Sequence, residues 1–282
     1  MKFLKWILIG GALAYLAIAS FLYFNQRSLL YFPPSIYVTP QTAGIDMREV
    51  KHQSFISWYK APETDTAPVI MFFHGNGSAI YSNSDIFADL TAQGYGVLSV
   101  GYPGYPGSVG KPTQGNIVRA AKFQRDWLKS EGIGVSRIVY FGTSLGSGIA
   151  AQLTALDPPA LLVMEAPFNS TLDMAKMHLP FLPHSILMKD KFRSDKALQN
   201  YDGPMIWMHG TKDGVVPFAQ GQKLYDGYDG PKSAHVFEGG RHTNLWGLGG
   251  RDIVLARLAL IFPASPANLL PQDHADVEGG EQ

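Results

Sequence analysis

The sequence has no cysteine in 282 residues, which excludes disulfide bonds, thiolate nucleophiles and cysteine-based metal sites. It also lacks an excess of either charge, because 23 Lys and Arg balance 23 Asp and Glu. A balanced chain gives no sign of the basic surface that binds nucleic acid, so no nucleic-acid partner is expected. Only 16% of the residues are charged and 46% are hydrophobic, which is typical of a globular chain with one additional apolar segment.

That additional segment lies at the N-terminus. The run from Trp6 to Phe24 contains no charged residue. About 19 apolar residues are just enough for a helix to cross the hydrocarbon core of a bilayer. A buried core helix would show a polar face at helical spacing, and this run shows none. We therefore predict that residues 1–25 form an N-terminal transmembrane anchor.

The charges around this run predict its orientation. Lys2 and Lys5 precede the span, whereas only Arg27 follows it closely. By the positive-inside rule the N-terminus is cytoplasmic and the rest of the chain is on the exported side, which is the periplasm if the source is bacterial. The alternative is a cleaved signal peptide, because Ala17-Ile18-Ala19 resembles a cleavage site. The apolar run continues past these residues, and its length favours the anchor.

From residue 69 onward, short apolar runs bounded by turn residues alternate with segments of helical periodicity. Continuous apolar runs are typical of strands buried on both faces of a parallel sheet. The alternation predicts right-handed βαβ units and an open, mostly parallel α/β sheet flanked by helices. The predicted strands are 69–73, 96–100, 138–141, 160–164, 205–208 and 234–237, after a strand-like stretch at 48–59, and the predicted helices are 85–93, 113–130, 145–156 and 252–261.

Differences in composition along the rest of the chain predict a linker, a cap and a tail. Residues 26–45 are rich in aromatics and prolines and are predicted to form a juxtamembrane linker before a domain at 46–262. Residues 169–200 interrupt the alternation with a long apolar stretch that contains prolines, and we expect short helices that cap the site. Residues 263–282 have little to bury and are predicted to be a disordered tail.

One motif carries a specific chemical expectation. Gly142-Thr143-Ser144-Leu145-Gly146 follows a predicted strand and precedes a predicted helix. Gly-x-Ser-x-Gly in that context is typical of a sharp turn that exposes a serine at the end of a strand, with glycines where side chains would collide. A structural glycine-rich turn is the alternative interpretation. A phosphate-binding loop fits less well, because no lysine follows the glycines.

A serine hydroxyl needs a neighbouring base, and the base needs an orienting carboxylate. His242 lies in a glycine-rich loop after the last predicted strand and is the predicted base, whereas His74 and His209 precede glycines at strand ends and look structural. Asp213, in a loop after the strand at 205–208, is the predicted acid, with Glu165 in reserve. The chain order serine, aspartate, histidine is the one expected on an α/β-hydrolase sheet.

Such a site also needs N–H donors for a developing oxyanion. The backbone N–H of Leu145 is one candidate, because it lies at a helix N-terminus where donors are unpaired. The backbone N–H of Asn76, in the loop after the strand at 69–73, is the second candidate. These two groups complete the predicted site.

Together these motifs resemble the α/β-hydrolase superfamily, and more narrowly its BEM46-like branch, which includes membrane-associated α/β-hydrolase-domain proteins. The resemblance runs from the anchor to about Ile261. It implies a serine hydrolase that cleaves carboxylic esters, thioesters or lipid-like acyl substrates through an acyl-enzyme, without a cofactor or metal. It rests on the segments His74-Gly75-Asn76, Gly101-Tyr102-Pro103-Gly104-Tyr105, Gly142 to Gly146, Ala166-Pro167-Phe168, His209 to Asp213, and His242.

Two alternatives stand beside this expectation. A prolyl-oligopeptidase-like peptidase uses the same constellation, although no propeller domain or long lid insertion is recognisable in this sequence. A catalytically silent hydrolase fold that serves as a membrane-tethered binding module is the other. The complete set of triad residues speaks against this second alternative.

Overall fold

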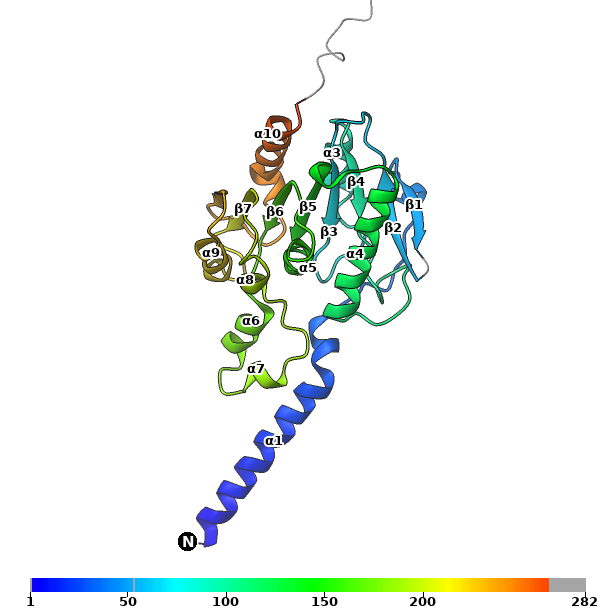
Figure 1. The fold of residues 1–282 in the computed structure, drawn as a ribbon. Helices are drawn as coiled ribbons and strands as arrows, with labels where there is room; N and C mark the ends of the chain where they lie inside the picture. Colours follow the sequence, from blue (N-terminus) through cyan, green and yellow to red (C-terminus); the bar gives the residue numbers. More distant parts are fainter. Residues whose placement is uncertain (1, 53, 264–282) are drawn as a thin grey trace, which may run out of the picture.

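The centre of the structure, a computed structural model that describes residues 2–52 and 54–263, is one eight-stranded sheet (Figure 1). Its strand order is β1-β2-β4-β3-β5-β6-β7-β8. The pairs β1–β2 and β2–β4 are antiparallel, and all pairs from β4 to β8 are parallel, so the predicted mostly parallel sheet is confirmed. The strands are β1 (Arg48–His52), β2 (Phe55–Lys60), β3 (Val69–Phe73), β4 (Gly96–Ser99), β5 (Ile138–Thr143), β6 (Leu161–Glu165), β7 (Met205–Gly210) and β8 (Lys232–Phe237).

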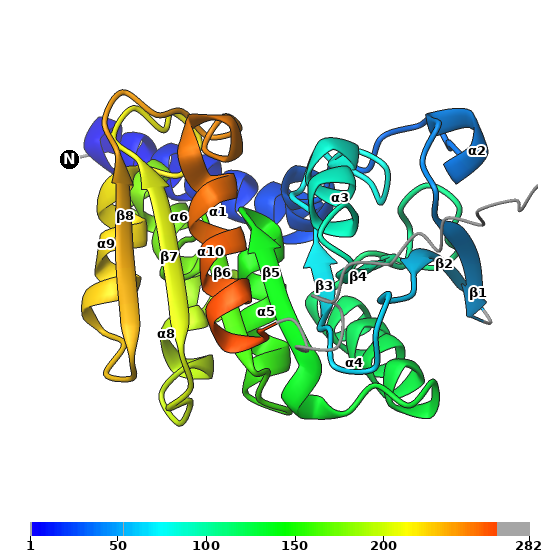
Figure 2. The ribbon, with the colours of Figure 1, turned by 90° about the horizontal axis from the view of Figure 1, so that it is seen from above.

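Helices cover both faces of the sheet (Figure 2). Side chains of β3 alternate between two cores: Met71 belongs to the core under α4, α5 and α9, and Phe72 to the core under α3 and α10. Both cores exclude water, which explains why the central strands are apolar at nearly every residue. The helices are α3 (Ser84–Thr91), α4 (Gln114–Ser130), α5 (Leu145–Thr154), α9 (Phe218–Asp226) and α10 (Arg251–Ile261), with a 3₁₀ turn at Val135–Arg137 and a π-helical turn at Trp246–Gly250.

The structure differs from the sequence-based expectation in two places within this domain. The strand-like stretch at 48–59 is a hairpin, in which Arg48 pairs with Tyr59 and His52 with Phe55. Its residues are mostly strand formers, so composition alone does not reveal where the chain reverses. Helix α9 was not predicted, because its nine residues include two glutamines, a glycine and two charged residues, which leaves a narrow apolar face.

The N-terminal helix is longer than the predicted anchor. Helix α1 (Lys2–Leu30) passes the expected boundary at residue 25, and no residue in it is buried. It is long and apolar enough to cross a membrane. The expected linker at 26–45 therefore begins as helix, becomes irregular at Tyr31 shortly before two prolines, and contains the short helix α2 (Pro40–Ala43).

The segment at 169–200, where we expect a cap, contains the short helices α6 (Thr171–His178), α7 (His184–Leu187) and α8 (Ser194–Ala197). We call residues 169–200 the cap. Figure 1 shows α6 and α7 at the same end of the molecule as α1, and α10 at the opposite end. The predicted tail at 263–282 lies outside the described residues, apart from Pro263.

Candidate active site

Ser144 lies on a strained turn between β5 and α5. Its φ of 51° and ψ of −119° are unusual for a residue with a side chain. The flanking glycines explain how the turn closes. A Cβ on Gly142 would lie 2.5 Å from the carbonyl oxygen of Gly146, and a Cβ on Gly146 would lie 1.9 Å from that of Phe73. A larger residue at either position would have to displace backbone.

The three side chains predicted to form a triad lie in one hydrogen-bonded chain. His242 Nε2 is 2.9 Å from Ser144 Oγ, and His242 Nδ1 is 2.7 Å from Asp213 Oδ2. They come from the loops that follow β5, β7 and β8, whose carboxyl ends meet at one edge of the parallel sheet. In this arrangement an imidazole can take a proton from a hydroxyl while a carboxylate holds its other nitrogen.

The environment keeps Asp213 ionised. Burial alone would raise its pKa, but hydrogen bonds outweigh burial, and the pKa is lowered below its usual range. His242 provides one of these bonds, and Oδ1 accepts the backbone N–H groups of Val215 and Val216 at 2.8 and 2.9 Å. The carboxylate therefore has both the charge and the orientation needed to stabilise an imidazolium at His242.

A second histidine also lies against this carboxylate. His209 Nε2 is 3.5 Å from Asp213 Oδ2 and 3.0 Å from the carbonyl oxygen of Val216. Burial lowers the pKa of His209, opposed by that carbonyl and by the charge of Asp213, so the ring is neutral and its Nε2–H faces both oxygens. From its place before a glycine at a strand end, the sequence indicates only a structural role for His209. The sequence signal for this contact is that His209 precedes Asp213 by only four residues.

The two predicted oxyanion donors lie at the same site. Asn76 and Leu145 line one cavity together with Ser144. Neither backbone N–H donates to a protein acceptor within the described part of the chain. The side chain of Asn76 holds its loop in place. Its Oδ1 accepts from the N–H of Phe32 and from the hydroxyl of Tyr105, both at 3.0 Å, and its Nδ2 donates to the carbonyl of residue 30, at the end of α1.

The other candidates occupy different positions. Glu165, the reserve acid, is the last residue of β6, and its backbone carbonyl accepts from the N–H of Ser144 at 2.9 Å. Burial, with a smaller contribution from the charge of Asp85, raises the pKa of Glu165 to about 7. It is Asp213, and not this carboxyl, that contacts His242. His74 is buried against a tyrosine ring at a centroid separation of 4.0 Å, consistent with a structural role.

The cavity at Ser144 has a volume of about 360 Å³, and the cap and α1 form its walls. The cap contributes mainly apolar side chains, among them Met174, Leu179 and Leu182. The contribution of α1 was not foreseen from the sequence, because it depends on where a helix remote in the chain docks. It consists of Leu22, Tyr23, Gln26, Leu29 and Leu30.

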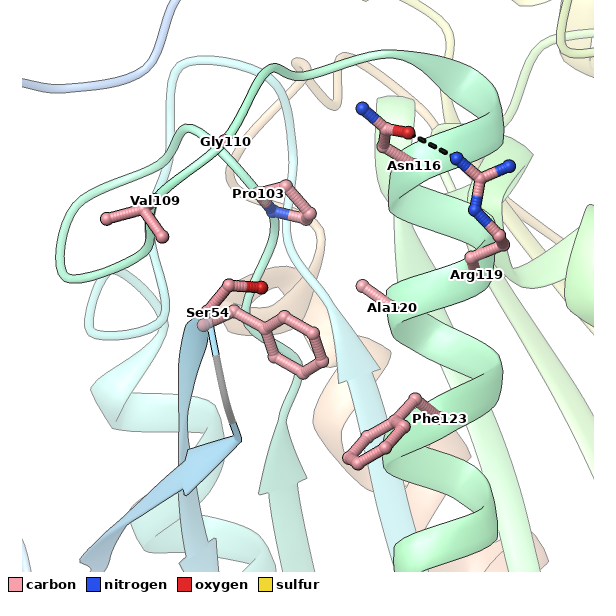
Figure 3. Close-up of a pocket in the computed structure, with 9 residues that line it drawn as sticks. Ser54, Pro103, Val109, Gly110, Asn116, Arg119, Ala120 and Phe123 are labelled. Atoms are coloured by element: carbon pink, nitrogen blue, oxygen red, sulfur yellow. Dashed lines mark hydrogen bonds between the residues drawn. The ribbon is translucent and has the colours of Figure 1, made fainter.

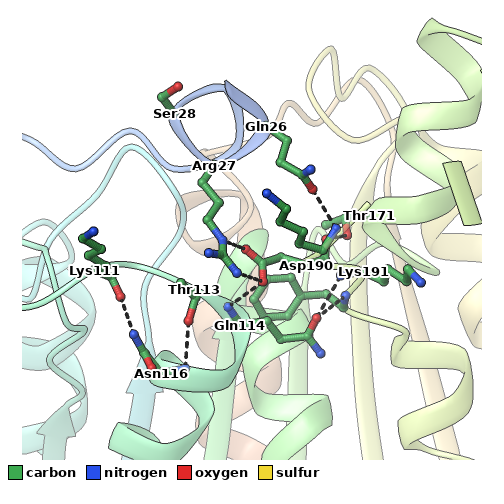
Figure 4. Close-up of polar contacts among 12 residues, drawn as sticks. Gln26, Arg27, Ser28, Lys111, Thr113, Gln114, Asn116, Thr171, Asp190 and Lys191 are labelled. Atoms are coloured by element: carbon green, nitrogen blue, oxygen red, sulfur yellow. Dashed lines mark hydrogen bonds and ion pairs between the residues drawn. The ribbon is translucent and has the colours of Figure 1, made fainter. Parts of the chain in front are cut away.

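A polar joint fixes α1 to the cap and to α4 (Figure 4). Arg27 forms an ion pair with Asp190, with Nε 2.8 Å from Oδ2, and the backbone N–H of Gln114 donates to Asp190 Oδ1 at 3.2 Å. The side chain of Gln114 in turn accepts the N–H groups of Lys191 and Phe192. Because Asp190 is buried, its partners specify the relative positions of three segments that are distant in sequence.

A second cavity, of about 350 Å³, lies between the β1–β2 hairpin and α4 (Figure 3). Phe55 and Phe123 form its apolar side, and on its polar side Arg119 donates to the side chain of Asn116. No predicted site residue is among the described residues that line it. A metal-binding group of three or more His, Asp or Glu side chains is also absent from residues 2–52 and 54–263.

Comparisons with known proteins agree with this fold. Residues 68–185 match the model of a protein family whose description is "alpha/beta hydrolase fold". The chain superposes on an esterase of Pyrococcus furiosus with a TM-score of 0.65 at 16% identity, covering 83% of this chain and 98% of the esterase. It superposes on a monoacylglycerol lipase of Paleococcus ferrophilus with a TM-score of 0.58 at 18% identity, covering 74% of this chain and 100% of the lipase.

The chain has the α/β-hydrolase fold. In sequence it is 29% identical over 249 residues to an uncharacterised protein of Mycobacterium tuberculosis, covering 85% of this chain and 88% of that protein. It is 31% identical over 189 residues to the lysophosphatidylserine lipase ABHD12 of Danio rerio, covering 60% of this chain. The chain spans about half the length of that lipase, 49%.

Proposed function

We propose that this protein is a membrane-anchored serine hydrolase that cleaves carboxylic esters or thioesters of lipid-like acyl groups. The observation that carries the proposal is the continuous chain of contacts from Ser144 Oγ through His242 to a buried, ionised Asp213. The fold is shared with esterases and lipases, and the similar sequences include a lipase, which supports an ester as the bond that is cleaved.

In the proposed reaction, Ser144 Oγ attacks the carbonyl carbon and gives its proton to His242 Nε2. The imidazolium is stabilised by Asp213, and the N–H groups of Asn76 and Leu145 stabilise the oxyanion. As the tetrahedral intermediate collapses, His242 returns the proton to the leaving alcohol or thiol, and an acyl-enzyme forms. Water, activated by the same histidine, then releases the acid and restores the serine.

The proposed location follows from α1. If α1 crosses the membrane with its lysine-flanked end in the cytoplasm, the hydrolase domain is on the exported side. The apolar walls of the cavity support an acyl chain as the bound part of the substrate.

The test is covalent labelling of the full chain in detergent by a fluorophosphonate, which reacts with activated serines. We expect wild type to be labelled and to hydrolyse p-nitrophenyl esters, and Ser144→Ala to lose labelling together with about 10⁴-fold or more in kcat. Ser130→Ala, at an exposed serine of α4, is the control and should match wild type.

Equal labelling of Ser144→Ala and wild type would refute the assignment of the nucleophile. Faster turnover of short peptide amides than of matched esters would instead indicate the peptidase. No labelling and no turnover across a broad acyl panel would indicate a silent binding module.

A further inference from the structure

The tip of the cap is mainly apolar and partly exposed. Residues 177–188 contain no Asp, Glu, Lys or Arg, whereas Lys176 and Lys189 stand directly on either side. Within the tip, Ile186 is 79% exposed and Phe181 is 57% exposed. Neither is among the described residues that line the cavity at Ser144, so substrate contact does not account for them. An apolar surface that ends at lysines on both sides has the composition of a segment that contacts lipid.

This tip lies along α1, the helix that is able to span a membrane. The hydroxyl of Tyr15 donates to the carbonyl oxygen of Phe181 at 3.2 Å, and the two rings are 6.4 Å apart. Tyr15 lies in the middle of the uncharged run from Trp6 to Phe24. Phe181 therefore sits at a level of α1 that the anchor would place inside the bilayer. Figure 1 shows α7 beside this helix.

The level of the membrane surface is marked by a second set of contacts. Lys189 Nζ lies 4.0 Å from the centre of the Tyr23 ring, and Gln26 Nε2 donates to the carbonyl oxygen of Leu187 at 3.1 Å. Aromatic rings and lysines are typical of the interface between hydrocarbon and water. From Tyr23 down to Tyr15 the helix descends about 12 Å. A single leaflet contributes about 15 Å of hydrocarbon, so the tip fits within one leaflet.

The cavity of Ser144 is continuous with this region. Leu22 and Tyr23 of α1 line it from one side, and Leu179 and Leu187 of the cap line it from the other. The same two elements thus form both the wall of the cavity and the surface beside the lipid. An acyl chain that moves from the leaflet into the cavity passes mainly apolar side chains.

We propose that the cap tip, residues 177–188, inserts into the leaflet next to α1 and opens the cavity at Ser144 to the hydrocarbon, so that the substrate is an acyl ester resident in that leaflet rather than one dissolved in water. The inference rests on the proposed function for the chemistry at Ser144. The position of the tip can be measured without any turnover.

The first experiment uses the absence of cysteine. Phe181→Cys and, as matched control, Leu260→Cys are each introduced into the full chain, spin-labelled, and placed in phosphatidylcholine vesicles. Leu260 is 71% exposed on α10, at the opposite end of the molecule. We expect the label at 181 to collide with dissolved oxygen and to be shielded from a water-soluble nickel chelate, and the label at 260 to show the reverse. Equal access of the nickel chelate to both labels overturns the proposal.

The second experiment measures the consequence for catalysis. The double variant Phe181→Asp/Ile186→Asp places charge at the tip without changing the residues of the cavity. On a long-chain acyl ester held in vesicles we expect its kcat/KM to fall by about tenfold or more, because carboxylates are strongly disfavoured in hydrocarbon. On a short, water-soluble ester we expect it to stay within about twofold of wild type, as for Leu260→Asp on both substrates.

Equal loss on both substrates would mean that the tip supports the site itself, and would overturn the inference. Full activity on the vesicle substrate would also overturn it. If wild type hydrolyses neither ester, the proposed function fails, and the accessibility of the label at 181 still decides where the tip lies.

Discussion

The edge of the sheet that carries Ser144 and the joint between α1 and the cap are built in different ways. At the sheet edge, the decisive contacts are between backbone atoms, because the strands are buried and glycines allow two chain segments to touch. At the joint, side chains hold together segments that are distant in sequence, as Arg27 does with Asp190. The backbone at the sheet edge therefore has almost no room to move. The position of α1 against the cap depends instead on a few polar side chains.

The two regions need different degrees of positional accuracy. A nucleophile must be held closely in position, because displacements of about 1 Å reduce rates severely. A wall that admits an acyl chain has only to present apolar surface of suitable shape. We therefore expect substitutions at the sheet edge to affect all substrates, and substitutions at the joint to affect long acyl chains selectively.

The largest effect in this comparison is expected from Gly146→Ala. The new Cβ would lie 1.9 Å from the carbonyl oxygen of Phe73, whose backbone belongs to the central strand β3. Overpacking of this kind costs about 3 kcal/mol, which lowers the melting temperature by roughly 6–12 °C for a domain of this size. Displacement of the turn should also reduce kcat on every ester by about 100-fold. Thermal unfolding in detergent and ester kinetics provide the measurements.

Gly247→Ala is the matched control, because nothing lies within 4 Å of a Cβ at that position. It should leave the melting temperature and the rates on both substrates close to wild type. If Gly146→Ala is as stable and active as this control, the close approach of the two backbone segments does not determine the turn.

This difference between local and long-range contacts also explains which parts of the structure the sequence predicts. The sheet and the positions of Ser144, Asp213 and His242 in loops at strand ends follow from local patterns, since each residue stands next to an apolar run and a turn signal. The wall that α1 provides does not follow, because Arg27 and Asp190 lie far apart in the chain and neither shows a local pattern. The contact of a second histidine with Asp213 was missed for a related reason: a histidine at a strand end looks structural until its neighbours are known.

A smaller and more selective effect is expected from Arg27→Ala. The variant removes one partner of Asp190, whose side chain is 5% exposed, while the Arg27 side chain is 45% exposed. Loss of a fully buried pair costs several kcal/mol, but the half-exposed arginine reduces this to about 1 kcal/mol. Because α1 then holds the cap less firmly, kcat/KM on a long-chain ester should fall by roughly fivefold, with little change on a short ester.

Arg251→Ala is the control for this prediction. Its pair with Asp89 has a similar geometry, 3.1 Å, and its side chain is 48% exposed, but it lies on α10, away from the cavity. It should leave the ratio of long-chain to short-chain activity unchanged. A parallel loss on both esters in Arg27→Ala would show that the joint supports the catalytic residues as well as the wall.

The smallest effect on activity is expected from Glu165→Gln, whose effect on stability depends on pH. Burial raises the pKa of Glu165 to about 7, above its ordinary value of 4.5, so the folded state binds this proton more tightly than the unfolded state. The group therefore destabilises the fold progressively as pH rises from about 4.5 to about 7. Glu165→Gln, which keeps the neutral shape, should raise the melting temperature by roughly 7–14 °C at pH 8 and change it little at pH 5. It should also retain most of the esterase activity, whereas Asp213→Asn should not. Loss of activity equal to that of Asp213→Asn would instead assign the orienting carboxylate to the end of β6.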